Sequence, residues 1–257
     1  MDNNSQTNQY GQMDFNLPHD IVPLPSGGKY YKSKKKSVKV GYLTASDENM
    51  LTNIVSQSNR ENLFTSLVRL KMYEPELKPE EMLFGDIEAI MIFLRNTSFG
   101  TDYTVSLTDP STEKKFNVTV DLGEIKIKTT LTEPDENGLF TTVLPKTGLT
   151  VKLKLLNAGD ELELTKRAES YPVGRVVPKI TWRLLKMIVS LDGNTDSEFI
   201  ASFIEKMPIM DSKHIRRFMN DNEPGLDLKK VILAPSGEQV EFEINFGVDF
   251  FRPFFGV

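Results

Sequence analysis

The chain has 257 residues, of which 39% are hydrophobic and 26% are charged, so it carries enough apolar material to build a core. Its 31 basic and 36 acidic side chains leave a formal net charge of −5. This balance disfavours a general nucleic-acid binder, because neutralising phosphates needs an excess of cations. The chain contains no cysteine, which excludes disulfides, thiolate metal ligands and thiol nucleophiles.

Residues 1–20 are polar and rich in amides, without a hydrophobic period, which predicts a flexible arm. The arm lacks the cationic and apolar regions of a secretion signal. The longest apolar run, Ala89–Leu94, is far shorter than the ~20 residues that span a bilayer. We therefore expect a soluble, cytoplasmic protein with no membrane partner.

Residues 21–100 are predicted to form a strand followed by a helical domain. Leu24–Tyr31 (LPSGGKYY) is typical of a turn, and alternation over Val38–Tyr42 predicts a short strand. Thr44 and Asp47 have the spacing of a capping box, so a helix should begin near Ala45. Helical spacing continues over Leu63–Tyr73, in a helix opened by Pro79, and over Ile87–Leu94 with Asp86 as its cap.

Residues 101–156 change to an alternation of period two and are predicted to be a β-rich region. Tyr103–Leu107 and Phe116–Leu122 flank a turn at Asp109–Ser111, which predicts a hairpin. Further strands are expected over Ile125–Leu131, Phe140–Leu144 and Leu149–Leu156, with a turn at Pro134–Gly138.

Residues 157–257 are predicted to form a helical domain with a terminal hairpin and an aromatic tail. Helical stripes cover Trp182–Leu191 and Phe199–Ile204, and Asp211 can cap a helix that contains Ile215 and Met219. Val231–Leu233 and Val240–Phe246 then form the last hairpin. The fold class is therefore α+β, with a helical N-terminal half, a central β-rich hairpin region and a helical C-terminal part that ends in a β-hairpin.

Residues suited to catalysis are scarce. His19 lies in the predicted arm and His214 on a predicted surface helix, and neither has a visible acid or nucleophile partner. The pair Gly28-Lys29 is followed by Tyr30, so it is no phosphate loop. Although carboxylate pairs can form in space, we expect no catalytic residue, metal site, cofactor or small-molecule substrate, and no enzymatic activity.

Two segments are candidates for binding another molecule. A basic stretch beside two tyrosines is suited either to a polyanion or to a solvated edge strand; its polyanion-binding candidates are Lys32, Lys34, Lys35 and Lys36. The phenylalanine-rich end either packs into the chain's own core or anchors it in a partner. The partner-binding candidates are Tyr30, Tyr31, Phe250, Phe251, Phe254 and Phe255.

Several short segments resemble the baseplate-hub and tail-assembly proteins of T-even-type contractile-tailed bacteriophages. The resemblance rests on residues 22–131: the LPSGGKYY segment, the strand and capped helix after it, Gly85-Asp86, and Phe93–Gly100 (FLRNTSFG) before Tyr103. Relatives often carry cysteine pairs in the following hairpin, forming a zinc-ribbon-like knuckle. The matching segment Leu107–Phe116 has no cysteine, so this hairpin must depend on apolar contacts from residues such as Phe116 and Val118.

The resemblance implies a structural or assembly role in the hub of a contractile tail baseplate, through protein-protein contacts. The implied partners are other phage tail and baseplate proteins, and the implied location is the host cytoplasm during assembly and then the virion tail baseplate. The alternative function is a nucleic-acid-binding accessory protein that uses Lys29–Lys36, although nucleic acid is the less favoured partner.

Overall fold

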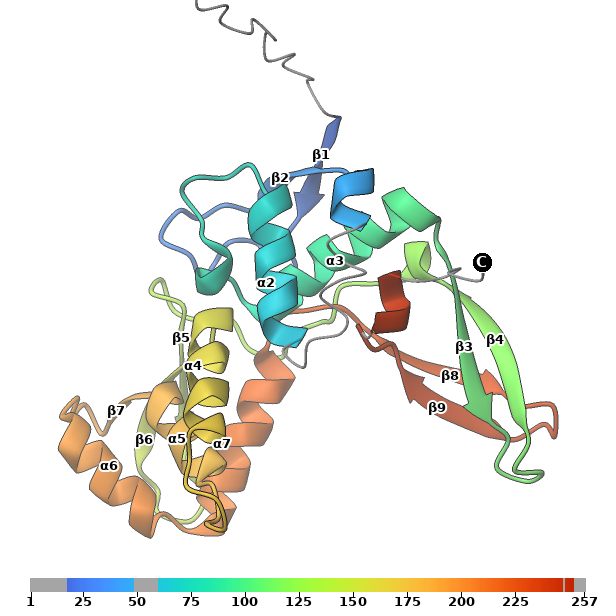
Figure 1. Cartoon of the computed structure of the whole chain (residues 1–257). Helices are drawn as coiled ribbons and strands as arrows, with labels where there is room; N and C mark the ends of the chain where they lie inside the picture. The colour runs from blue at the N-terminus through green and yellow to red at the C-terminus, as the bar shows by residue number, and fades with distance from the viewer. Residues whose placement is uncertain (1–17, 49–59, 247, 252–257) are drawn as a thin grey trace, which may run out of the picture.

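The computed structural model describes residues 18–48, 60–246 and 248–251 and has the predicted α+β fold (Figure 1). The helices are α2 (Arg60–Lys71), α3 (Phe84–Phe99), α4 (Ala158–Glu169), α5 (Lys179–Met187), α6 (Ser197–Lys206) and α7 (Ile209–Asn222), with short 3-10 turns η1 (Pro79–Glu81), η2 (Leu122–Glu124) and η3 (Val248–Phe251). The strands are β1 (His19–Pro23), β2 (Ser37–Gly41), β3 (Asp102–Thr108), β4 (Lys115–Asp121), β5 (Leu139–Val143), β6 (Thr150–Lys154), β7 (Ile188–Leu191), β8 (Lys229–Leu233) and β9 (Gln239–Glu243). Within the described residues they form small antiparallel sheets, ordered β1-β2, β3-β4, β5-β6-β7 and β8-β9.

The first sheet contains a strand that the sequence does not predict. β1 pairs with the predicted strand β2, and Val22 lies opposite Val38 with both side chains buried. The predicted arm therefore ends before His19, because pairing with β2 buries Val22 and offsets the entropy of ordering the segment. The rest of the arm, residues 1–17, lies outside the described residues.

The helices after β2 begin partly as predicted. Thr44 donates from its backbone and its hydroxyl to Asp47 Oδ2 (2.7 and 2.8 Å), and residues 45–48 are helical, which confirms the capping box. Pro79 opens only the single turn η1. The predicted cap Asp86 is wrong: α3 begins at Phe84, and the Asp86 carboxylate bonds instead to a distant turn.

Two hairpins, β3–β4 and β8–β9, extend to one side of the helices (Figure 1). Their tips are joined, since Ser236 N–H donates to Asp109 Oδ2 (3.0 Å) and Ser111 Oγ to Glu238 (2.5 Å). Both hairpins are as predicted. The strand predicted over Ile125–Leu131 is wrong, because among the described residues this segment forms only an isolated bridge between Ile127 and Leu226.

The remaining sheet, β5-β6-β7, packs with α4–α7 (Figure 1). The helical stripe predicted over Trp182–Leu191 is wrong at its end, because Ile188–Leu191 leaves the helix and pairs with β6. Asp211 is not the predicted cap, since α7 begins at Ile209; its buried carboxylate accepts from the Lys146 and Thr147 N–H groups instead (2.7 and 3.1 Å).

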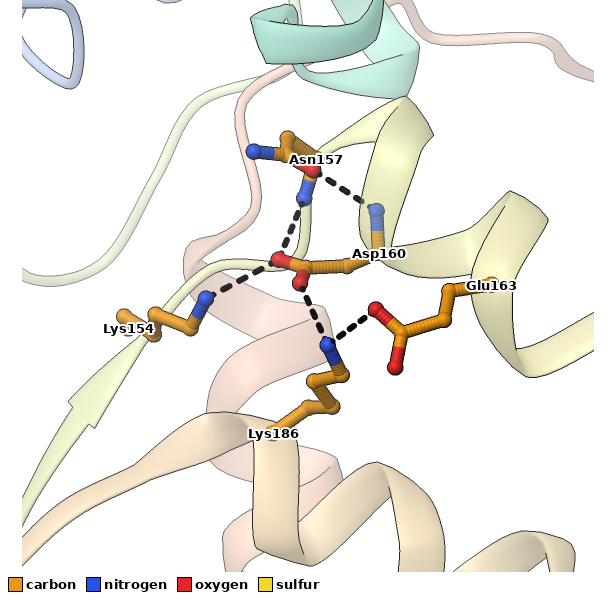
Figure 2. A network of polar contacts seen from close by, with 5 residues as sticks. All are labelled: Lys154, Asn157, Asp160, Glu163 and Lys186. Carbon is orange, nitrogen blue, oxygen red and sulfur yellow. Dashed lines mark hydrogen bonds and ion pairs between the residues drawn. The ribbon is translucent and has the colours of Figure 1, made fainter.

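A polar network fixes the start of α4 against this sheet (Figure 2). Asn157 caps α4 and accepts from Asp160 N–H (2.8 Å), while Asp160 accepts from Asn157 N–H (3.4 Å). Lys154 of β6 and Lys186 of α5 both contact the Asp160 carboxylate (3.0 and 3.4 Å), and Lys186 also contacts Glu163 (2.6 Å). These charges are already paired with one another, so we regard the network as structural.

Candidate functional site: a candidate protein interface

The turn that carries part of the family resemblance is held by a buried carboxylate. Asp86, which is fully buried, accepts from Ser26 N–H (2.8 Å), from Ser26 Oγ (2.5 Å) and from the Tyr31 hydroxyl. The Tyr31 oxygen in turn accepts from Leu83 N–H (2.9 Å). Burial raises the pKa of Asp86, and burial next to that carboxylate raises the pKa of Tyr31. The network fastens Leu24–Tyr31 to α3.

The two tyrosines proposed as partner contacts occupy different environments. Tyr31 is only 4% exposed and belongs to the buried network, so it offers no surface to a partner. Tyr30 is half-buried and stacks on Phe140 at 6.1 Å. Burial and the nearby Glu133 raise the pKa of Tyr30 to about 12. Its position supports packing between Leu24–Tyr31 and β5 and leaves part of the ring accessible.

Two of the four lysines proposed to bind a polyanion, Lys34 and Lys35, are engaged within the chain, as is Lys29 of the same stretch. Lys29 forms an ion pair with Glu133, and Lys35 contacts Glu74 and Glu76 (3.2 and 3.5 Å). Lys34 Nζ donates to two backbone carbonyls, at Lys29 and Glu136 (3.0 and 3.3 Å). Lys32 and Lys36 are exposed. The stretch therefore offers less free positive charge than its sequence indicates.

The C-terminal phenylalanines divide into two groups. Phe250 and Phe251 are 0% and 5% exposed, and the Phe250 ring contacts those of Tyr103 and Phe246 (5.5 and 4.7 Å between centroids). This pair packs into the chain's own core. Phe254 and Phe255 lie outside the described residues and stay predicted partner contacts.

The other segment of the resemblance, FLRNTSFG, places a buried cation at the end of α3. Arg95 is 1% exposed and donates to the carbonyls of Gly100 and Asp102, the second at 2.7 Å. Its guanidinium carbon lies 5.7 Å from the centre of the Tyr103 ring. Arg95 therefore joins the end of α3 to β3 and to the aromatic cluster around Phe250.

An apolar groove, which we name the β1 groove, lies between β1 and α3. Its volume is about 340 Å³. Ile21 and Ile127 on its sides are 66% and 54% exposed. It is lined by Ile21, Val22, Pro23, Pro25, Ala89, Ile92, Phe93, Asn96, Leu122, Gly123, Ile125, Ile127 and Leu226. Both segments of the resemblance thus contribute to one surface, through Pro25 on one side and Phe93 and Asn96 on the other.

The β1 groove is bordered by an open strand edge. The bonds Leu24 N–H to Lys36 O (2.9 Å) and Tyr42 N–H to Pro18 O (3.3 Å) fix which residues of β1 bond to β2. By alternation, the backbone N–H and C=O groups of Ile21 point away from β2. Among the described residues β1 pairs only with β2, so this edge can accept another strand.

Sequence reasoning missed the β1 groove because its residues are distant in the chain and are mostly ordinary apolar residues.

Groups that could support chemistry are few: in the described ranges no cluster of three His, Cys, Asp or Glu residues could hold a metal ion. His214 Nε2 contacts Thr142 Oγ1 at 2.9 Å, and His19 lies on β1. No helix of the described residues is long and apolar enough to cross a membrane. The site is suited to binding.

Comparison with known families gives one match, to the family described as T4 bacteriophage base plate protein, over residues 21–252. The match covers most of the chain and extends well beyond residues 22–131, on which the resemblance rests. Comparisons with curated proteins and with solved structures give no match.

Proposed function

Because the chain belongs to the family of T4 bacteriophage base plate proteins, we propose that it is a hub component or hub-assembly factor that acts through protein contacts. The match over residues 21–252 is the observation that carries the proposal. Membership indicates a structural, tail-located protein of a bacteriophage. The hub position, the assembly role, the absence of a reaction of its own and a residence in the host cytoplasm before assembly are our proposals.

We further propose that the β1 groove receives an extended segment of a neighbouring baseplate protein. The outward N–H and C=O groups of Ile21 would pair with the main chain of that segment, while its apolar side chains would occupy the groove. Exposed apolar side chains beside an open edge support this mode, because most isolated proteins protect such edges. The occupant is thus a strand, and its affinity would come from backbone pairing.

Nucleic-acid binding through Lys29–Lys36 has weaker support. Ion pairs with Glu133, Glu74 and Glu76 engage two of these lysines, and the chain as a whole is acidic. Protein partners need no such excess of free cations.

The test uses a phage that lacks this gene, complemented by variants of the full chain. Ile21→Pro removes an outward N–H at an edge position, where proline is tolerated, together with one apolar side chain that lines the β1 groove, so the fold should persist while strand addition fails. Ile127→Lys places a charge in the β1 groove. We expect both variants to enter baseplates at least about tenfold less than the parent chain, a loss of about 1.4 kcal/mol or more in affinity.

Val143→Lys is the matched control, because Val143 is a strand residue with 56% exposure away from the groove. It should enter baseplates normally. Normal entry of both groove variants would refute the groove as the contact surface. Failure to find the parent chain in any purified tail intermediate or particle by mass spectrometry would refute the baseplate role itself.

A further inference from the structure

The connection between α4 and α5, residues 170–178, lies at the end of α4 remote from β1 (Figure 1). Side-chain contacts hold its base in place. The chain's single tryptophan, Trp182, is buried, and its ring meets Tyr171 edge-on at 5.4 Å while the Arg167 guanidinium lies 4.2 Å from it. Aromatic and cation–π contacts of this kind order the base of the connection.

Two apolar side chains project from this ordered base. Val173 and Val176 are 104% and 92% exposed, the two highest values among the large hydrophobic residues that the structure describes. Ile180, at the start of α5, is 50% exposed. The turn that contains Val173 is closed by Arg175 N–H donating to Pro172 O (3.3 Å), with Gly174 at φ +84°. Exposed apolar side chains that lie close together in the chain are candidates for a contact surface.

The same surface is basic in an acidic chain. Residues 166–183 contain five basic side chains and one acidic one, whereas the whole chain has a net charge of −5. Arg183 pairs with Glu161 (2.5 Å), but within the described residues no ion pair holds Lys166, Arg175 or Lys179. Unpaired cations around exposed apolar side chains complement an acidic surface that has an apolar centre.

We propose that this α4–α5 surface, comprising Val173, Arg175, Val176, Lys179 and Ile180, docks onto an acidic face of another protein in the same assembly. The proposal rests on the proposed baseplate function. A cleft of about 430 Å³ adjoins this surface; its lining is mixed, with apolar Leu164, Val177 and Trp182 beside the charged Glu161, Glu169, Lys179 and Arg183.

A protein partner is favoured over nucleic acid. Binding of single-stranded nucleic acid relies on aromatic rings that bases can stack on, and here Trp182 is buried and packed against Tyr171. A phosphate backbone also offers nothing to Val173 and Val176. An acidic protein face with a central apolar patch satisfies both the cations and the valines.

The experiment measures binding of the purified full chain, fluorescently labelled, to tail intermediates from cells infected with a phage that lacks this gene. One variant, Val173→Ser with Val176→Ser, removes the apolar side chains. The other, Arg175→Glu with Lys179→Glu, reverses the charge. The emission of Trp182 checks that the base of the connection is intact in each variant. Arg217→Glu is the control, because that side chain is 87% exposed on α7.

We expect both double variants to bind at least about tenfold more weakly than the parent chain and the Arg217→Glu control. Raising the salt from roughly 50 to 300 mM should weaken the parent chain and the serine variant alike, and should affect the charge-reversed variant much less.

Unchanged binding of both double variants, with the parent chain still bound to the intermediates, would overturn this docking surface alone. Absence of parent-chain binding would overturn it together with the baseplate role. Equally tight binding to a duplex DNA oligonucleotide would assign the surface to a polyanion. Self-association that the charge reversal abolishes would assign it to a second copy. Either result contradicts the proposal.

Discussion

Glu88, on the second turn of α3, lies where three parts of the molecule meet. A Cβ built on Gly225 would lie 3.9 Å from Glu88 Oε2, so the carboxyl group faces the chain that leaves α7. Lys128 N–H donates to Gly225 O (2.9 Å), which brings the segment after η2 to the same point. The carboxylates of Glu223 and Glu243 are the charged groups that act on it. An ionised Glu88 carboxylate is therefore poorly solvated, and the carboxylates of Glu223 and Glu243 repel it.

Burial first, and then the charges of Glu223 and Glu243, raise the pKa of Glu88 from its ordinary 4.5 to about 8. Between these two values the folded chain holds a proton that the unfolded chain has lost. The free energy of unfolding must then fall as pH rises, by about 1.36 kcal/mol per pH unit, or at most about 5 kcal/mol over the window. The contribution is fully present below 4.5 and lost above about 8.

Glu88→Gln replaces this carboxyl group by a neutral amide of similar shape. The variant should lose most of the decline in stability between about pH 6 and about pH 9, and should exceed the parent chain in stability at the upper end. A smaller slope should remain, because burial and the charge of Glu161 also raise the pKa of Glu223. Urea unfolding followed through Trp182, the single tryptophan, measures each free energy.

Glu124→Gln, which alters an exposed carboxylate on η2, is the matched control and should keep the slope of the parent chain. Identical slopes for the parent chain and Glu88→Gln would refute the reasoning, as would a parent chain that becomes more stable as pH rises.

Two further predictions concern the contacts of α3. Gly85→Ala places a Cβ 2.3 Å from Pro224 O and should lower the free energy of unfolding by about 1–3 kcal/mol. Gly225→Ala lies across the same contact, but its Cβ meets the nearest atom at 3.5 Å, so this variant should lose less stability. Thermal melting of both variants checks the order. Tyr31→Phe leaves the Asp86 carboxylate and the Leu83 N–H without their hydroxyl partner. The free energy of unfolding, measured in urea, should fall by about 1–3 kcal/mol. A change below about 0.5 kcal/mol would contradict the buried network.

Local signals in the sequence gave correct predictions where neighbouring residues decide the structure. The Thr44 and Asp47 capping box, the turn at Pro134–Gly138 and both predicted hairpins depend on residues within a few positions of each other. Asp135 illustrates this, since its carboxylate and backbone close the turn onto Leu139. The family resemblance has the same character, because it rests on short contiguous segments.

Predictions failed where a distant partner competes for the same residue. Asp86 and Asp211 have the right type and position to cap helices, yet each carboxylate accepts from several N–H and O–H groups of a turn about 60 residues away. Ile188–Leu191 follows a helical pattern but pairs with β6. A short apolar run is compatible with a helix or a strand, and here the available edge of β6 favours the strand.

The sequence by itself determined the family, the α+β class and the position of most elements, because composition, alternation and capping are properties of adjacent residues. Only the tertiary structure decided which candidate residues are accessible. It buried Tyr31 and Phe250, paired Lys35 with Glu74, assembled the β1 groove from residues 21–226 and left Val173 and Val176 in solvent. Exposure and charge pairing depend on what packs against each side chain, and that neighbour is set by the folded chain as a whole.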